Sequence, residues 1–259
     1  MNNQLSGASR NPVGGHVPVA GGLHSVGLSY ARDLKAEAVQ VFVANPRGWA
    51  TPTGNPKQDE AFRAACGAES VPAYVHAPYL INFGSHTEAT VERSVALRQV
   101  REHLLPLLDE LTHDDDPFLL LESTAGQGAS LCSRTWDFGP YFEALDAHPM
   151  LGVCLDTCHI FAAGHDLTGP SGMHQTLDLL VDTVGEGRLK LIHANDSKDV
   201  VGAHKDRHEN IGVGHIGEDP FRALMTHPAT EGVPLIIETP GGKQGHAADV
   251  ERLKKLRDD

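Results

Sequence analysis

The stretch Leu189-Lys-Leu-Ile-His193-Ala-Asn-Asp196 decides the fold, because a short apolar run ends there in a group of polar side chains. Such a run is typical of a strand that is buried on both faces of a parallel sheet. Asp206 and His208 follow in the next loop, two positions apart, so both side chains point the same way on an extended segment. Imidazoles and carboxylates gathered in this way are typical ligands of a divalent metal such as zinc.

Six further apolar runs predict strands, at residues 13–17, 38–43, 73–76, 118–122, 152–156 and 235–238. Most of them are separated by amphipathic segments, for example 62–70 and 173–184. This alternation predicts a parallel sheet covered by helices, and a chain of 259 residues suits one such domain. We therefore predict a single α/β domain over residues 1–259, a TIM (β/α)8-type barrel, in preference to a doubly wound sheet.

The predicted strands share one feature: each carries chemically capable polar side chains at its C-terminal end. These are His16, Asn45 with Arg47, His76, Glu122, Asp156 with His159, His193 with Asn195, and Glu238. In a barrel, all strand C-termini open onto the face that holds the active site. One such residue is an ordinary loop feature, whereas seven strands that end alike predict a shared site.

Only seven strands can be predicted, whereas a closed barrel of this type has eight. The interval between His76 and Phe118 contains one helical stretch, 88–111, and no strand. Val91 and Val95 lie on the opposite side of this helix from its apolar stripe, which comprises Leu97, Val100, Leu104, Leu107 and Leu111. The break in phase near residues 94–95 predicts that one βα unit, in the region of the fourth strand, is missing.

The net charge of −13 argues against a general electrostatic footprint for nucleic acid. It is compatible with a local one, because carboxylates that bind metal ions are neutralised. The four cysteines have no zinc-finger spacing and are expected to be free thiols in a reducing cytosol. Without a leader-like N-terminus or an apolar run of membrane-spanning length, we expect no membrane association and a cytoplasmic location.

Two metal-binding groups can be assembled from these residues. Glu122, Asp156, His193 and Glu238 offer three carboxylates and an imidazole, a set that can hold a pair of cations for displacement at phosphorus. His159, Asp206 and His208 offer three ligands and leave a coordination position open, as a catalytic zinc requires. The chain contains no G-x-S-x-G elbow, P-loop or dinucleotide fingerprint that would favour another chemistry.

Several motifs together give the chain a resemblance to a known family. They are Gly152-Val-Cys-Leu-Asp-Thr-Cys-His159, His193-Ala-Asn-Asp-Ser-Lys198, Asp206-Arg-His-Glu-Asn-Ile-Gly212, Glu122-Ser-Thr-Ala-Gly-Gln-Gly128, Asn45-Pro-Arg-Gly-Trp49 and Pro234-Leu-Ile-Ile-Glu-Thr239. On these motifs the chain resembles endonuclease IV, the apurinic/apyrimidinic (AP) endonuclease of the xylose isomerase-like barrel superfamily. The similarity extends over almost the whole chain, from about residue 12 to about residue 255.

The resemblance implies a monomeric barrel that holds three zinc ions and acts on double-stranded DNA. Such an enzyme cleaves the phosphodiester 5′ to an abasic site and trims blocked 3′ ends. Carried over by motif, Glu122 would be the catalytic bridge between the first two metals, and His76 would bind the first. Asp156, His193 and Glu238 would hold the second metal, and His159, Asp206 and His208 the third. Arg47, Tyr79 and Leu80 match residues that enter the minor groove.

One family ligand has no counterpart in this chain. The fourth strand of the family ends in a histidine that completes the first metal site, and no such motif occurs between His86 and Glu122. Neither His103, within the helix, nor His113, before an acidic loop, is a convincing substitute. The missing strand, the phase break and the missing ligand together indicate one absent segment, a βα unit of roughly 25–35 residues.

The missing ligand leaves three interpretations open. The first is an AP endonuclease with lowered activity. The second is a protein that binds abasic DNA or zinc without cleavage. The third is a metal-dependent sugar isomerase on the same barrel, which Asp206-Arg-His208 and Asn45-Pro-Arg47 disfavour, because a small sugar requires neither a third metal nor an arginine that enters the groove.

Overall fold

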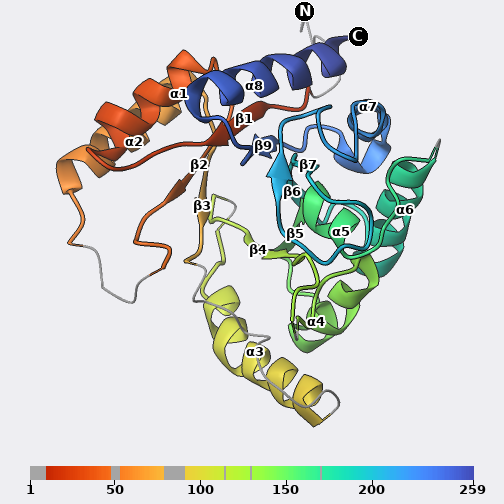
Figure 1. Cartoon of the computed structure of the whole chain (residues 1–259). Coiled ribbons are helices and arrows are strands. Elements are labelled where there is room, and N and C mark those ends of the chain that lie inside the picture. Colours follow the sequence, from red (N-terminus) through yellow and green to blue (C-terminus); the bar gives the residue numbers. More distant parts are fainter. Residues whose placement is uncertain (1–9, 48–52, 79–90, 114, 129, 170) are drawn as a thin grey trace, which may run out of the picture.

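The computed structural model describes residues 10–47, 53–78, 91–113, 115–128, 130–169 and 171–259, without the side chains of 91–95. Seven strands form one sheet in the order β3-β2-β1-β9-β6-β5-β4, and every pair is parallel (Figure 1). The strands are β1 (Val13–His16), β2 (Val39–Phe42), β3 (Ala73–His76), β4 (Leu119–Glu122), β5 (Leu151–Asp156), β6 (Leu189–His193) and β9 (Leu235–Ile237). Each of the seven predicted strands is therefore present, in a parallel sheet as expected.

Helices cover the outer face of this sheet (Figure 1). They are α1 (Ser29–Asp33), which follows a π-helical turn at Leu23–Leu28, α2 (Pro56–Glu69), α3 (Val91–Asp109), α4 (Phe138–Ala144), α5 (Thr157–Ala162), α6 (Gly172–Val184), α7 (Asp219–Thr226) and α8 (Gly242–Asp258). Short 3-10 turns lie at Thr135–Asp137 and Pro228–Thr230, and β7 (Asp196–Ser197) pairs antiparallel with β8 (His208–Glu209). In the described ranges, no helix is both long and apolar enough to cross a bilayer.

Alternation along the strands divides the apolar residues between two layers. On β5, Val153 and Leu155 belong to the main core, which includes side chains of α5 and α6. Cys154 belongs to a small inner layer with Ala38, Leu191 and Ile236. Because side chains alternate between the two faces of a strand, Asp156 lies on the same inner side as Cys154, at the end of the strand.

β1 and β2 approach each other closely enough to require a glycine. A Cβ atom at Gly14 would lie 1.7 Å from the carbonyl oxygen of Ala38, closer than any non-bonded contact. Gly14 is therefore explained by packing of the backbone at this point.

The sheet is open between β3 and β4, which form its two edges. In the described residues these two strands do not pair, and we call this break the open seam. The chain between them contains α3, which packs against α4 and contributes Val100, Leu104 and Leu108 to the main core. The open seam lies where the sequence lacks its fourth strand.

One detail of the predicted helix is wrong. The sequence pattern places Leu107 on the apolar stripe of 88–111, but its side chain is 54% exposed, and Leu108 is buried instead. α3 meets the core along the row Val100, Leu104 and Leu108, at intervals of four residues, and this row turns Leu107 outward. The predicted phase break near 94–95 concerns side chains outside the described ones.

Candidate metal centre

Strand ends bring one group of predicted ligands together around His193. Glu122 ends β4, Asp156 ends β5 and Glu238 directly follows β9. The Nδ1 atom of His193 lies 3.0 Å from Glu122 Oε1, 3.5 Å from Glu238 Oε2 and 3.8 Å from Asp156 Oδ2. The ligand atoms of Asp156, His193 and Glu238 all lie within 4.8 Å of one another, a separation at which one cation can contact all three.

A second group lies beside the first. His159 comes from the first turn of α5, Asp206 from the segment that joins β7 to β8, and His208 from the first position of β8. Asp206 Oδ1 lies 3.2 Å from His159 Nε2 and 3.1 Å from His208 Nε2. Asp156 connects the groups, because its Oδ2 atom lies 3.6 Å from His208 Nε2.

Backbone carbonyls orient both imidazoles of the second group. His159 Nδ1 donates to the carbonyl oxygen of Ser123 at 2.8 Å, and His208 Nδ1 donates to that of Glu238 at 3.1 Å. The two Nε2 atoms are buried and make no well-aligned hydrogen bond among the described residues, although both face Asp206 Oδ1. An unsatisfied buried nitrogen costs about 1–3 kcal/mol, and histidines held through one ring nitrogen typically bind metal through the other. This donor set therefore fits zinc.

Charge in the cluster shifts the pKa of its members. Burial alone would lower the pKa of His159, but the carboxylates of Asp156, Asp206 and Glu122 raise it to about 10. The pKa of His208 rises to about 9 for the same reason, against the effect of burial. The imidazoles of His159 and His208, which both face its Oδ1 atom, hold the pKa of Asp206 far below its usual range. Protons thus balance the carboxylates, and a cation would replace those protons when it binds.

The first metal site of the family is less complete. His76 Nε2 lies 3.5 Å from Glu122 Oε2, and the His76 ring stacks on that of His193 with centroids 5.9 Å apart. Among the described residues, His76 belongs to no group of three ligand atoms within 4.8 Å. The side chains of His103 and His113 are exposed, as expected for residues that do not replace the missing ligand.

Sequence reasoning missed a polar residue behind the cluster. Gln40, in the middle of β2, is 2% exposed. Its Oε1 atom lies 2.8 Å from His193 Nε2, and its Nε2 atom lies 2.7 Å from Glu238 Oε1. The one sequence feature that could have pointed to Gln40 is the presence of a glutamine inside the apolar run 38–43.

Asn195 also supports the cluster from behind. Its side chain donates to Asp156 Oδ2 at 2.8 Å and accepts from the backbone N–H of Glu238 at 2.8 Å. It thereby ties the end of β5 to the end of β9. The sequence shows its place at the end of a strand but not this role.

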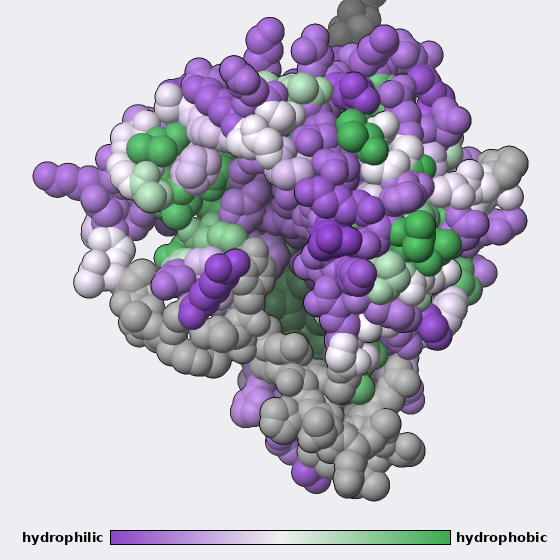
Figure 2. Space-filling model, in the orientation of Figure 1, coloured by the Kyte–Doolittle hydropathy of each residue, from purple (hydrophilic) through white to green (hydrophobic). Residues whose placement is uncertain are grey.

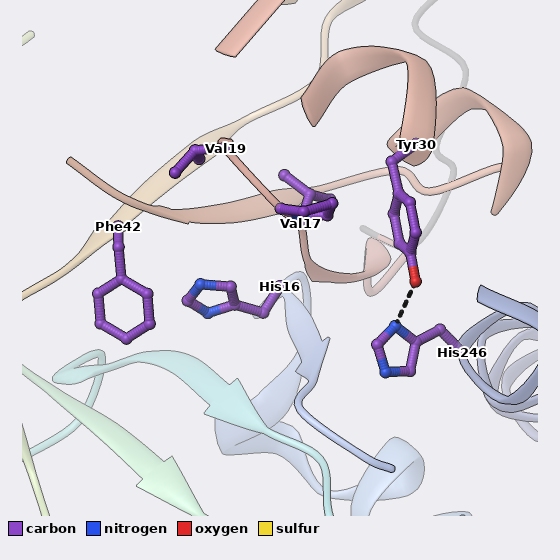
Figure 3. A pocket seen from close by; sticks show the side chains of 7 residues that line it. His16, Val17, Val19, Tyr30, Phe42 and His246 are labelled. Carbon is purple, nitrogen blue, oxygen red and sulfur yellow. Dashed lines mark hydrogen bonds between the residues drawn. The ribbon is translucent and has the colours of Figure 1, made fainter. Parts of the chain in front are cut away.

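A cavity of about 400 Å³ adjoins the cluster (Figure 3). His16, Tyr30, Phe42 and His246 line it, and the Tyr30 hydroxyl is 2.9 Å from His246 Nδ1. The His16 ring connects the cavity to the cluster, because its Nδ1 atom is 3.3 Å from Glu238 Oε1. The hollow is therefore a mostly apolar recess next to the ligand groups.

The predicted DNA-contacting residues are only partly placed. Arg47 is exposed, and its backbone N–H donates to Asn45 Oδ1 at 3.0 Å, so the loop after β2 presents its side chain to solvent. Tyr79 and Leu80 lie outside the described residues. Figure 2 shows mostly hydrophilic residues over the face in view, with a hollow near its middle.

Comparison with known proteins identifies relatives along almost the whole chain. A family profile described as a xylose isomerase-like TIM barrel matches residues 94–256. The probable endonuclease 4 of Streptomyces avermitilis is 84% identical over 285 aligned positions, which cover 97% of this chain and 92% of that protein. The probable endonuclease 4 of Streptomyces coelicolor is 82% identical over 286 aligned positions, which cover 98% of this chain and 97% of that protein.

Solved structures agree with these relatives. The crystal structure of endonuclease IV from Thermus thermophilus superposes with a TM-score of 0.80 at 29% identity, covering 96% of this chain and 99% of that one. The predicted barrel-type fold is thus confirmed, with the sheet incomplete.

The alignment lengths show how much is missing. In the S. avermitilis comparison, 97% of this 259-residue chain is about 251 residues, so about 34 of the 285 aligned positions have no counterpart here. The size agrees with the βα unit inferred from the sequence, and we place it at the open seam.

Proposed function

The chain belongs to the endonuclease IV family of xylose isomerase-like TIM barrels, and on that premise we propose that it is a zinc-dependent AP endonuclease. Its substrate would be double-stranded DNA in the cytoplasm, cleaved 5′ to an abasic site or trimmed at a blocked 3′ end. The observation that carries the proposal is the second group itself: in the described part of the chain, the buried Nε2 atoms of His159 and His208 converge on Asp206 Oδ1, and all three ligand atoms lie within 4.8 Å of one another.

The ligand groups suggest how metal ions would be divided among these residues. Asp156, His193 and Glu238 would hold one ion. The second group, His159, Asp206 and His208, would hold another. Glu122 lies between His76 and His193 and would help to hold the ions on either side of it. When bound, such ions polarise a phosphodiester and stabilise the charge that develops on the attacking and leaving oxygens.

The chain itself supplies positioning and charge. Asp156 caps α5 by accepting the backbone N–H of His159 at 2.9 Å, so one carboxylate fixes the helix that carries a ligand. Buried Asn195 and Gln40 hold the ligand side chains in place before substrate arrives. Divalent cations would offset part of the net charge of −13 at the face that DNA approaches.

The incomplete first site is expected to lower the activity. Among the described residues, His76 belongs to no group of three ligand atoms, so His76 and Glu122 would give that ion too few protein ligands. We therefore expect about two tightly bound zinc ions per chain instead of three, with slower cleavage than the S. avermitilis relative.

The test is metal content by mass spectrometry and cleavage of a duplex that contains one abasic-site analogue. The expected result is two tightly bound zinc ions, and chelator-sensitive incision 5′ to the analogue. His208→Gln should remove one ion and abolish cleavage, whereas Gln175→Ala, on the exposed face of α6, should change neither. A protein that binds no zinc and leaves the duplex intact contradicts the proposal.

A second candidate is an abasic-DNA binder that does not cleave. The open seam and the incomplete first site favour it, because the second group and Arg47 are retained while one ligand is not. Tight binding of the abasic duplex with no incision at saturating zinc would support this alternative over the first.

A further inference from the structure

Gln40 occupies an unusual position for an amide. It lies in the middle of β2, where its neighbours Val39 and Val41 belong to an apolar cluster on the outer side. Strand alternation turns Gln40 inward, and parallel pairing sets it opposite His16 on β1 and Tyr74 on β3. A buried amide is stable only when its donors and acceptor are satisfied, so its partners explain its presence.

The partners fix which way the amide points. A carboxylate can only accept, so the NH2 group of Gln40 must face Glu238 Oε1, at 2.7 Å. The same NH2 group lies 3.1 Å from His16 Nδ1. The amide oxygen therefore faces His193, 2.8 Å from Nε2, and that nitrogen must donate. With a proton on Nε2, a neutral His193 carries its lone pair on Nδ1.

This arrangement is the reverse of the one in the second group. His159 and His208 donate through Nδ1 to backbone carbonyls and present Nε2. His193 presents Nδ1 to Glu122, Glu238 and Asp156, so it requires an acceptor at Nε2. Gln40, from a strand that is not adjacent to β6, provides that acceptor.

We propose that Gln40 is a positioning residue of the metal centre, which holds His193 in the Nε2–H tautomer and fixes Glu238 with the other end of the same amide. The proposal rests on the proposed function, because it assumes that the cluster binds zinc. One amide thus orients two candidate ligands of one ion: its oxygen holds the His193 ring and its NH2 group holds the Glu238 carboxylate.

The test compares two glutamine-to-methionine variants. Methionine has a similar length and no strong hydrogen-bonding group, so Gln40→Met keeps the volume and removes the contacts. Gln58→Met is the matched control, because Gln58 Oε1 accepts from the backbone N–H groups of His24 and Ser25 at 3.1 and 3.0 Å, outside the cluster. Zinc affinity is measured by chelator competition, and the protonated nitrogen of His193 by long-range 15N–1H spectra of the zinc-loaded protein.

The expected result is a loss of zinc affinity of about 10–100-fold in Gln40→Met and none in Gln58→Met. In zinc-loaded Gln40→Met the Nε2 of His193 should remain protonated, because zinc on Nδ1 requires it, but its 15N signal should shift because the acceptor is lost; the same signal should not shift in Gln58→Met. If Gln40→Met does not fold, Gln40→Asn, which keeps the amide but falls short of both partners, replaces it.

Three outcomes overturn the inference, and they are distinguishable. Wild-type protein that binds no zinc contradicts the proposed function and the positioning role together. Wild-type protein that binds zinc, with Gln40→Met matching both its zinc affinity and its His193 Nε2 signal, contradicts the positioning role alone. Equal losses in Gln40→Met and Gln58→Met also overturn it, because they indicate general destabilisation.

Discussion

Asp206 holds two imidazoles through a single oxygen, Oδ1, although its side chain is 46% exposed. An exposed carboxylate with two buried neighbours is typical of a ligand at the mouth of a site rather than of a structural ion pair. A substitution of Asp206 is therefore a direct test of whether the second group binds zinc.

Asp206→Asn should weaken the binding of one zinc ion by more than about 100-fold, because it removes a charged ligand without changing the volume. Unfolding in the presence of chelator should shift little, since the side chain is half exposed. Metal titration followed by mass spectrometry measures the first quantity, and thermal unfolding the second. Zinc affinity equal to that of the wild type would show that Asp206 is not a ligand.

The ion pair of Glu37 with Arg257 should make the stability of the fold depend on pH. Burial alone would raise the pKa of Glu37, but the hydrogen bond from Arg257 and the one from the Val13 backbone lower it. A depressed folded-state pKa stabilises the fold above the unfolded pKa, near 4.5, and this stabilisation is lost as the pH falls through the folded value.

Glu37→Gln should therefore cost about 1 kcal/mol at pH 7, a small value because the carboxylate is 37% exposed and screened by solvent. The difference from the wild type should vanish below the folded-state pKa. Urea unfolding at several pH values measures both, and a difference that persists undiminished at low pH contradicts the assignment.

Among the elements, β1 and β2 depend on a close backbone approach. Gly14→Ala should be strongly destabilising, by more than about 3 kcal/mol, because the added Cβ would overlap the Ala38 carbonyl. Gly67→Ala, in the last turn of α2 with nothing within 4 Å, should instead stabilise the protein by about 0.5 kcal/mol. Chemical denaturation of the two variants compares the effects, and similar values for both would refute the argument.

The elements also show what a sequence can reveal. The seven strands could be predicted because each is a short apolar run, although β3 and β4 beside the open seam are only partly buried. Most of the candidate ligands could be proposed because they lie at or just after the polar end of such a run. Gln40 could not be given a role, since its partners His193 and Glu238 are 153 and 198 residues away. The burial of Leu108 rather than Leu107 depends on the angle at which α3 packs against the core. The periodicity of the sequence does not distinguish these two adjacent positions.

For the whole molecule, the open seam is the feature with the largest effect. Inserting the corresponding segment of the S. avermitilis relative, about 34 residues, between residues 94 and 95 should raise the zinc content toward three and increase incision at least about 10-fold. It should also raise the unfolding temperature, because two edge strands gain partners. A glycine-serine insert of equal length is the control. Equal behaviour of the two inserts would disprove the assignment of the missing unit.

The strand order has one more consequence, which concerns the time course of synthesis. In a closed barrel the strands form a continuous ring, but in this open sheet β9 alone connects β3-β2-β1 to β6-β5-β4 among the described strands. β9 comprises only Leu235–Ile237, close to the C-terminus. Chains still being translated therefore carry two unconnected half-sheets, which should remain sensitive to protease until the last strand has emerged from the ribosome. Protease resistance of a stalled chain that ends before β9 would contradict this order of assembly.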